Sequence, residues 1–299
     1  MVLPADVTVA NLDAYFARVE SAFNDITPGC EKRVQWDGNQ GEVTDWALLY
    51  VHGFSATSEE VRPVPDNIAA ALGANVVYTR LEGHGRDGAA LGKATLNGWR
   101  ADFDEALAAA KLVGRKILIM STSTGGTLTA ESAVDPKAME DVVGLIFVAP
   151  NFAINNPGAF LLTLPGIRIW GPWVAGRHRE FDVRNERHGR YWTTSYPTVS
   201  VVPVAEAVRD VRGLDFSTVK TPAFFFFSDK DEVVKPAATR KVIAAWGGPS
   251  QVINPTLGPQ DDENHHVVTG DTLSPGQTEF TTQSILDWVK GLSWNKGSL

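Results

Sequence analysis

Short apolar runs alternate along this chain with longer amphipathic stretches, and this alternation constrains the fold more than any other feature. Helices are predicted at residues 95–113, which end at Gly114, and at residues 278–290. The strand candidates are almost continuously hydrophobic, which is typical of strands covered on both faces. They are residues 46–51, 75–81, 116–120, 142–148 and 222–227. Because strands alternate with helices, we expect an α/β fold with a mostly parallel central sheet flanked by helices.

Length and charge limit the classes of protein that this sequence fits. The chain has 299 residues, enough for one large domain or two small ones with a buried core. It carries 27 Lys and Arg against 35 Asp and Glu, a net charge of −8, and it contains no basic block. A protein that follows the phosphate backbone of nucleic acid needs such a block, so we expect no nucleic-acid partner.

The cysteine and histidine content argues against a disulfide and a metal site. Cys30 is the sole cysteine, which excludes an internal disulfide and a Cys-x-x-Cys site, and we expect it to be a small, partly buried hydrophobe. The six histidines show no metal-ligand spacing. Two of them, His265 and His266, are adjacent and would point apart on an extended backbone. We therefore expect no metal.

The hydropathy pattern predicts a cytoplasmic protein. Residues 1–10 lack the basic and continuously apolar segments of a signal peptide. The chain has no run of 18 apolar residues, so we expect no membrane span. The sequence leaves the oligomeric state open.

One segment interrupts the alternation of strands and helices. Residues 151–212 contain no convincing strand and are rich in large apolar side chains. The segment follows a predicted core strand, and ligands of open α/β sheets bind at the carboxyl ends of the strands. We therefore predict a helical cap at 152–212, inserted into a core domain of residues 1–151 and 213–299. The side chains predicted to line its substrate pocket are Phe160, Leu161, Leu162, Trp170 and Trp173. The alternative is a packing layer with no role in ligand selection.

A predicted strand enters a sharp turn at residues 116–126. The turn contains Ser-Thr-Ser-Thr-Gly, which is similar to the G-x-S-x-G pattern of a nucleophile elbow. The outer positions of that pattern are small because the turn is tight, and the central serine exposes its hydroxyl. Ser123 occupies the central position, and Ser121 replaces the first glycine. Such a turn also occurs without a function, so the motif needs support from other parts of the chain.

The first support is an earlier strand that ends in His52, Gly53 and Phe54. A glycine lets the backbone turn closely toward a developing negative charge, so we expect the Phe54 N–H to be one donor of an oxyanion hole. The Thr124 N–H would be the second donor, because a helix N-terminus has free N–H groups and a favourable dipole. We expect His52 to fix this loop rather than to transfer protons.

The second support lies downstream, where acidic residues and then histidines follow the serine. Asp229, Asp231 and Glu232 come directly after a predicted strand, and His265 and His266 follow a later one. The order Ser, Asp, His is that of the α/β hydrolases and differs from the orders in chymotrypsin and subtilisin. The sequence therefore predicts a nucleophile, an acid and a base at one edge of the sheet.

Taken together, these motifs resemble the α/β-hydrolase superfamily, in particular bacterial carboxylesterases and monoacylglycerol-lipase-like or lysophospholipase-like serine hydrolases. The resemblance covers nearly the whole chain. It rests on residues 52–55, 80–85, 121–126, 228–234 and 264–271. It implies an α/β-hydrolase fold with a cap.

The same resemblance selects the acid and the histidine. In such hydrolases the acid often occurs as Asp-x-x-Val, which matches Asp231 and Val234. The histidine is often followed by Val and, a few residues later, by Asp, which matches His266 with Val267. The implied catalytic residues are Ser123, Asp231 and His266.

The expected reaction is hydrolysis of a small carboxylic ester of short-to-medium acyl chain through an acyl-enzyme, with no cofactor. An acyltransferase, a perhydrolase or a thioesterase would use the same residues. A ligand-binding protein on the hydrolase fold is the alternative from another class.

Two further patterns are expected to carry no function. Residues 83–88 satisfy G-x-G-x-x-G after a strand, but residues 89–93 show no clear helix start, so a dinucleotide site is disfavoured. The acids at 261–263 are expected to form a solvated charged run beside the histidines.

Overall fold

The computed structural model describes residues 3–292 and is built around a seven-stranded sheet. The strand order is β1-β3-β2-β4-β5-β8-β9, and only the edge strand β1 runs antiparallel to its neighbour. The strands are β1 Arg33–Gln35, β2 Thr44–Val51, β3 Ala74–Tyr78, β4 Gly114–Thr122, β5 Val142–Val148, β8 Ala223–Phe226 and β9 Ser250–Ile253. The expected mostly parallel α/β sheet is confirmed, and each predicted strand lies within a few residues of its place.

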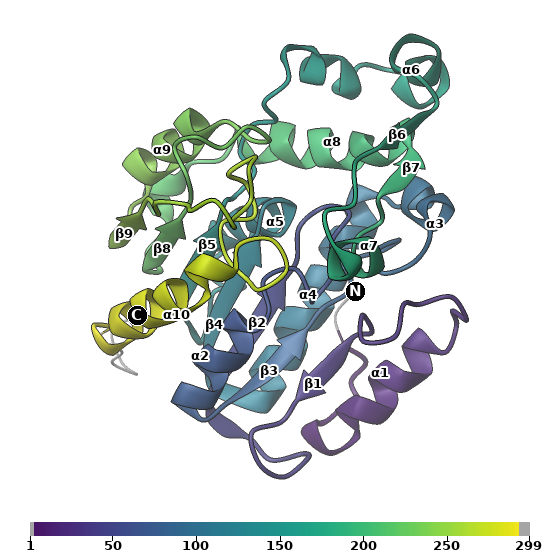
Figure 1. The fold of residues 1–299 in the computed structure, drawn as a ribbon. Coiled ribbons are helices and arrows are strands. Elements are labelled where there is room, and N and C mark those ends of the chain that lie inside the picture. The colour runs from purple at the N-terminus through teal and green to yellow at the C-terminus, as the bar shows by residue number, and fades with distance from the viewer. Residues whose placement is uncertain (1–2, 293–299) are drawn as a thin grey trace.

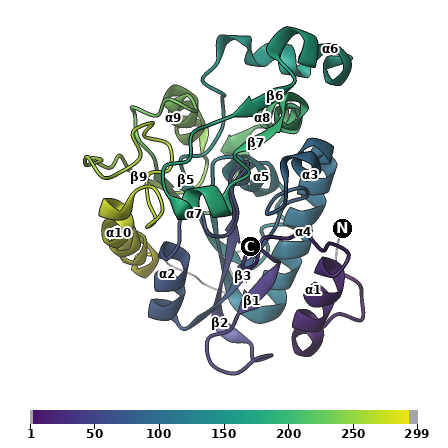
Figure 2. The ribbon, with the colours of Figure 1, turned by 45° about the vertical axis from the view of Figure 1, so that its right-hand side comes forward.

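The apolar strand residues form the core, because helices cover both faces of the sheet. Helices α2 and α10 pack on one face and α4 and α5 on the other (Figures 1 and 2). The α-helices are α1 Leu12–Glu20, α2 Val64–Leu72, α3 Gly88–Lys93, α4 Leu96–Val113, α5 Thr124–Ala133, α6 Ile167–Ala175, α7 Glu186–Tyr191, α8 Val202–Val211, α9 Pro236–Ala245 and α10 Thr278–Lys290. The 3₁₀ turns are η1 Val9–Asn11, η2 Pro157–Thr163, η3 Thr198–Val201, η4 Phe216–Thr218 and η5 Pro275–Gln277. Among residues 3–292, no helix is long and apolar enough to cross a membrane.

The segment between β5 and β8 leaves the sheet and lies at one end of it (Figure 1). The expectation that it contains no strand is wrong. Strands β6 His178–Glu180 and β7 Ser195–Pro197 form a separate antiparallel pair. Each strand has three residues and β6 is fully exposed, so neither shows the apolar alternation by which a strand is recognised in a sequence. At the end of the segment, α8 packs against α5 and α4 of the core.

The glycines of the G-x-G-x-x-G pattern serve the packing of this segment. Contrary to expectation, a helix does start here: α3 begins at Gly88 and is capped by the Asp87 carboxylate. A Cβ on Gly88 would lie 2.2 Å from the Ser195 carbonyl oxygen, so β7 can approach α3 only because this residue is a glycine. Gly83 has a φ of +80°, which suits glycine in a turn.

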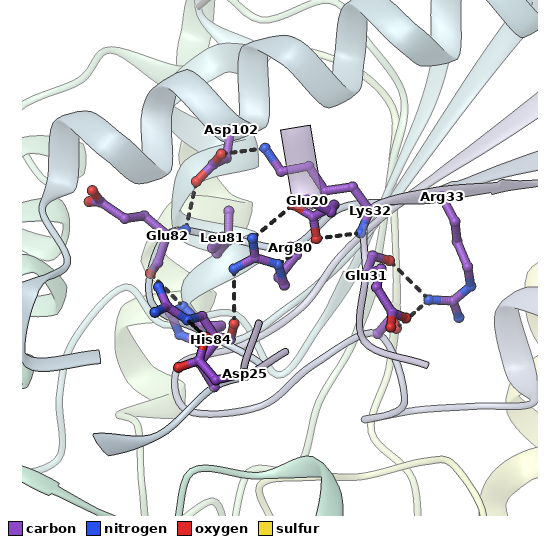
Figure 3. A network of polar contacts seen from close by, with 12 residues as sticks. Glu20, Asp25, Glu31, Lys32, Arg33, Arg80, Leu81, Glu82, His84 and Asp102 are labelled. Carbon is purple, nitrogen blue, oxygen red and sulfur yellow. Dashed lines mark hydrogen bonds and ion pairs between the residues drawn. The ribbon is translucent and has the colours of Figure 1, made fainter. Parts of the chain in front are cut away.

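A buried network of ion pairs ties the N-terminal segment to the loop after β3 (Figure 3). Arg80 donates to both oxygens of Glu20 at 2.7 and 2.8 Å and to the His84 carbonyl oxygen at 3.2 Å. The Lys32 amine lies 2.6 Å from Asp102 of α4. Because the side chains of Arg80 and Glu20 are only 4% and 7% exposed, each charge depends on its partner.

Removal of Arg80 should therefore cost far more stability than removal of a surface arginine. Arg80→Ala leaves the Glu20 carboxylate buried without a cation, which typically costs about 3–5 kcal/mol. Arg115→Ala is the control, because its pair with Asp45 is largely exposed, and it should cost less than about 1 kcal/mol. Urea unfolding of the variants measures both, and equal losses would contradict a stabilising role for the network.

Candidate active site

Ser123 lies at the sharp turn between β4 and α5, at the carboxyl edge of the sheet. Its backbone has a φ of 48° and a ψ of −113°, an unfavourable conformation for a residue with a side chain. The turn is held by hydrogen bonds from the Ser123 N–H to the Val148 carbonyl and from the Asn151 N–H to the Ser123 carbonyl, each of 3.0 Å. Such strain at a single serine is the property expected of a nucleophile elbow.

The small residues of the elbow allow close backbone contacts. A Cβ on Gly125 would lie 2.3 Å from the Val51 carbonyl oxygen, so the start of α5 touches the end of β2. Ser121 stands where the pattern usually has a glycine, and its hydroxyl lies 3.3 Å from the Ile146 carbonyl of the neighbouring strand β5. The departure from the pattern is therefore accommodated within the sheet.

Three of the predicted residues form a continuous hydrogen-bonded chain. His266 Nε2 lies 3.0 Å from Ser123 Oγ, and His266 Nδ1 lies 2.8 Å from Asp231 Oδ2. The other carboxylate oxygen of Asp231 accepts the N–H groups of Val233 and Val234, both at 2.8 Å. A neutral His266 with its proton on Nδ1 can accept the serine proton through Nε2.

The neighbouring acid and histidine lie elsewhere. Asp229 forms an ion pair with Arg240 and accepts a hydrogen bond from Asn254 at 2.7 Å. His265 has a positive φ of 54°, so the backbone turns between the two histidines. Its ring shares no hydrogen bond with Ser123 or Asp231 among the interactions of residues 3–292.

Asp262 is a residue of the site that the sequence reasoning missed. It is 5% exposed and accepts the N–H groups of His266 and Val267, both at 3.0 Å. Of the predicted solvated run 261–263, only Glu263 is exposed, so that expectation is wrong for Asp261 and Asp262. A run of acids looks solvated in a sequence, whereas here two of them bind backbone N–H groups of the histidine loop and its surroundings.

The charges around His266 favour its protonated form. Burial lowers the pKa of the imidazole, but the carboxylates of Asp231, Glu60 and Asp262 outweigh it and leave the pKa above 6.5. We therefore expect the neutral, proton-accepting form of His266 to increase as the pH rises through that raised pKa.

His52 and its neighbours fix the loop that carries Phe54. His52 is fully buried, and burial lowers its pKa to about 4. Its Nε2 accepts the Leu81 N–H at 3.1 Å, so the proton is on Nδ1, which donates to the Gly53 carbonyl at 2.8 Å. The Phe54 N–H belongs to the same trans peptide as that carbonyl and points the opposite way. His52 thus orients the predicted oxyanion donor.

Aromatic rings and the segment between β5 and β8 support the same loop. The Phe54 ring lies 5.9 Å from His84 and 5.2 Å from Tyr196 of β7. The Thr193 N–H donates to the Ser55 carbonyl at 2.7 Å. Within the described chain, neither the Phe54 N–H nor the Thr124 N–H donates a hydrogen bond, so both are available to a ligand.

A cavity of about 1070 Å³ opens beside Ser123 and His266. Of the side chains predicted to line a substrate pocket, Leu161, Leu162 and Trp170 lie in the wall of this cavity. Phe160 and Trp173 do not, which corrects the prediction: they are 66% and 79% exposed on the outer surface of the segment. A sequence can mark a segment as apolar, but it does not tell which side of a short helix faces inward.

Polar atoms also line this cavity. Thr124 and Asn151 are among the residues that line it, and their Oγ1 and Oδ1 atoms are buried and have no hydrogen-bond partner among residues 3–292. No cluster of three or more His, Cys, Asp or Glu side chains suited to a metal occurs in the described part of the chain.

Comparisons with known proteins find similar sequences. A family model described as serine aminopeptidase, S33, matches residues 42–201. A thermostable monoacylglycerol lipase from Bacillus sp. (strain H-257) is 27% identical over 192 residues, which are 63% of this chain and 72% of the relative.

Solved structures share the fold at low sequence identity. A structure from a study of LipS and LipT, two metagenome-derived lipolytic enzymes, matches with a TM-score of 0.69 and 20% identity over 89% of this chain and 99% of that one. A soluble variant of monoglyceride lipase from Saccharomyces cerevisiae has a TM-score of 0.62 and 11% identity, covering 90% and 98%. Est1E from Butyrivibrio proteoclasticus, with bound ferulic acid, has a TM-score of 0.59 and 18% identity, covering 90% and 99%.

The family model spans more than half of the 299 residues. The chain therefore belongs to the serine aminopeptidase S33 family of α/β hydrolases.

Proposed function

We propose that the protein is a serine carboxylesterase that hydrolyses short-to-medium acyl esters through an acyl-enzyme. The observation that carries the proposal is the hydrogen-bonded chain from Ser123 through His266 to Asp231. Ser123 Oγ attacks the ester carbonyl while His266 Nε2 takes its proton. Asp231 holds the imidazole in the required tautomer and stabilises the imidazolium.

The remaining steps use the same groups. The Phe54 and Thr124 N–H groups bind the oxyanion of the tetrahedral intermediate. His266 returns its proton to the leaving alcohol, and the ester bond breaks to leave an acyl group on Ser123. His266 then takes a proton from water, which attacks the acyl carbonyl carbon. The bond from that carbon to Ser123 Oγ breaks, His266 returns its proton to Ser123 Oγ, and the carboxylic acid is released. These reaction steps require no cofactor.

The cavity supports an acyl chain on its apolar side. Leu161, Leu162 and Trp170 offer apolar surface there, and we propose that residues 152–212 act as the cap that encloses the chain. Each methylene buried against such surface contributes about 0.8 kcal/mol, so longer chains bind better until the cavity is filled.

A transferase, a perhydrolase or a thioesterase would share the acyl-enzyme and differ in its acceptor or leaving group. A non-catalytic binder would hold an ester without releasing product. Product analysis with a panel of chromogenic esters of increasing acyl length separates hydrolysis from acyl transfer and from binding without turnover, because only hydrolysis releases free acid and alcohol in equal amounts. The same panel set beside a thioester of equal acyl length separates an esterase from a thioesterase.

Replacement of the nucleophile should abolish turnover without loss of fold. Ser123→Ala removes one oxygen and should lower kcat by about a millionfold at an almost unchanged melting temperature. Ser121→Ala is the matched control, since its hydroxyl lies against the Ile146 carbonyl, and should stay near wild type. A serine-reactive phosphonate followed by peptide mapping should label Ser123. An inactive Ser121→Ala beside an active Ser123→Ala would show that the nucleophile is misassigned.

Adjacent residues give a second paired test. Asp231→Asn should lower kcat about ten-thousandfold because it disturbs the tautomer of the histidine, and His266→Ala should be more severe. Asp229→Asn and His265→Ala should change kcat by less than about tenfold, because neither side chain shares a hydrogen bond with Ser123 or His266. Steady-state kinetics rank the four variants, and the reverse ranking would refute the assignment.

Substitution within the segment 152–212 tests the acyl site. Trp170→Ala enlarges the cavity and should move the preferred acyl chain to greater length, with each newly buried methylene worth about fourfold in kcat/KM. Trp173→Ala is the control, because this side chain is 79% exposed and does not line the cavity. Phosphonate labelling should be retained in both. If both variants keep the wild-type chain-length profile, the segment does not select the acyl chain.

A further inference from the structure

A carboxyl group outside the Ser, His and Asp chain lies in the cavity wall beside the nucleophile. Glu60 is 3% exposed and lines the same cavity as Ser123 and His266. The point at which a Cβ on Gly53 would stand lies 2.7 Å from Glu60 Oε1 and 3.2 Å from Ser123 Cβ. The carboxyl group, the oxyanion loop and the elbow are therefore immediate neighbours.

The two oxygens of Glu60 have different surroundings. Oε2 accepts the Gly53 N–H at 2.8 Å and the Tyr50 hydroxyl at 3.1 Å. Oε1 accepts no hydrogen bond within residues 3–292, and it is not among the enclosed polar atoms that lack a partner. Because Glu60 lines the cavity, its free oxygen is open to a bound substrate.

Within residues 3–292, no lysine or arginine forms an ion pair with Glu60, which favours its acid form. Its neighbour Glu59 takes the ion pairs with Arg33, Arg62 and Arg187. Burial raises the pKa of Glu60 to about 7, against the lowering effects of the Gly53 N–H, His266 and Tyr50. Glu60 therefore keeps its proton to a higher pH than an ordinary glutamate does.

We propose that Glu60 in its acid form is a third hydrogen-bond donor to the carbonyl oxygen of the ester, beside the Phe54 and Thr124 N–H groups. Oε2 already accepts two hydrogen bonds and acts as the carbonyl oxygen of the acid, so the proton is on Oε1, the oxygen that has no hydrogen-bond partner among residues 3–292. This inference rests on the proposed esterase function.

Electrostatics makes the protonation state decisive. A neutral carboxylic acid can donate to an oxyanion, as in other enzymes that keep an acid protonated at neutral pH. An ionised Glu60 would instead place a negative charge beside the one that develops on the substrate. His266 and Tyr50 are the titratable groups that act directly on Glu60, while Asp231 and Asp262 act on His266.

Glu60→Gln separates the donor role from that of a charged acceptor. The amide oxygen can accept the hydrogen bonds of Gly53 and Tyr50, and the amide NH₂ then donates into the cavity at every pH. In the wild type, kcat/KM should rise as His266 loses its proton and fall as Glu60 loses its own near pH 7. In Glu60→Gln the fall should disappear. The kcat/KM of this variant should be within about threefold of the wild-type value at pH 6.5 and at least tenfold higher than the wild-type value at pH 9.

Two more variants complete the comparison. Glu60→Leu has no donor and should lower kcat about a hundredfold at pH 6.5, with little change in KM. Glu59→Gln should keep the wild-type pH profile, because its carboxylate pairs with arginines rather than the oxyanion loop. Folded Glu60→Gln and Glu60→Leu variants that lose activity equally at all pH values would overturn the donor role, as would a Glu60→Gln profile with the wild-type fall.

A measurement without substrate tests the same proton. Carboxyl ¹³C NMR of the full chain, with the Glu60 signal assigned by its loss in Glu60→Gln, should show a titration midpoint near 7. A midpoint below about 5, the range of an ordinary glutamate, would overturn the proposal. Absence of both ester turnover and Ser123 labelling in the wild type would overturn the proposed function and the donor role together. Turnover with a Glu60→Gln profile identical to that of the wild type would overturn the donor role alone.

Discussion

The structure of the site depends on the close approach of two backbone segments at the carboxyl edge of the sheet. Val51 and Ser121 are paired in the parallel register of β2 and β4, so the loops that follow start side by side. A side chain on Gly125 would collide with the Val51 carbonyl, and one on Gly53 would press on Ser123 Cβ and Glu60. Close packing at these glycines places the strained serine against the loop that carries Phe54. The catalytic proposal requires this placement, because donors must stand ready where the oxyanion forms.

Electrostatics divides the histidines of the site into two kinds. His52 and His84 are fully buried behind the loop, and burial lowers the pKa of both, so they remain neutral and act as fixed packing and hydrogen-bonding groups. His266 faces Asp231, with Glu60 and Asp262 nearby, and its pKa is raised. Of these three histidines, only His266 is thus placed to change its charge during a reaction near neutral pH. Arg80 pairs with Glu20, the last residue of helix α1, and donates a hydrogen bond to the His84 carbonyl oxygen. Helix α1 thus supports the loop through Arg80.

The sequence predicted the sheet and the residues that form the hydrogen-bonded chain because those features depend on local patterns. Strands buried on both faces are almost purely apolar, and an elbow needs small residues at fixed offsets around Ser123. The strands β6 and β7, the outward position of Trp173 and the burial of Asp262 could not be predicted, because each is set by contacts with distant segments. Glu60 belongs to no sequence motif, and only the fold places its carboxyl group beside Gly53 and Ser123. Local patterns thus identify the groups that react, and tertiary contacts identify the groups that position them and adjust their charge.

The most direct test of the account is a crystal structure of the protein after reaction with an ester-like phosphonate. If the proposed mechanism holds, a covalent bond joins Ser123 Oγ to phosphorus, and the phosphoryl oxygen lies about 3 Å from the N–H groups of both Phe54 and Thr124. A phosphonate bonded to another residue, or bonded to Ser123 with its oxygen directed away from those two N–H groups, would contradict it.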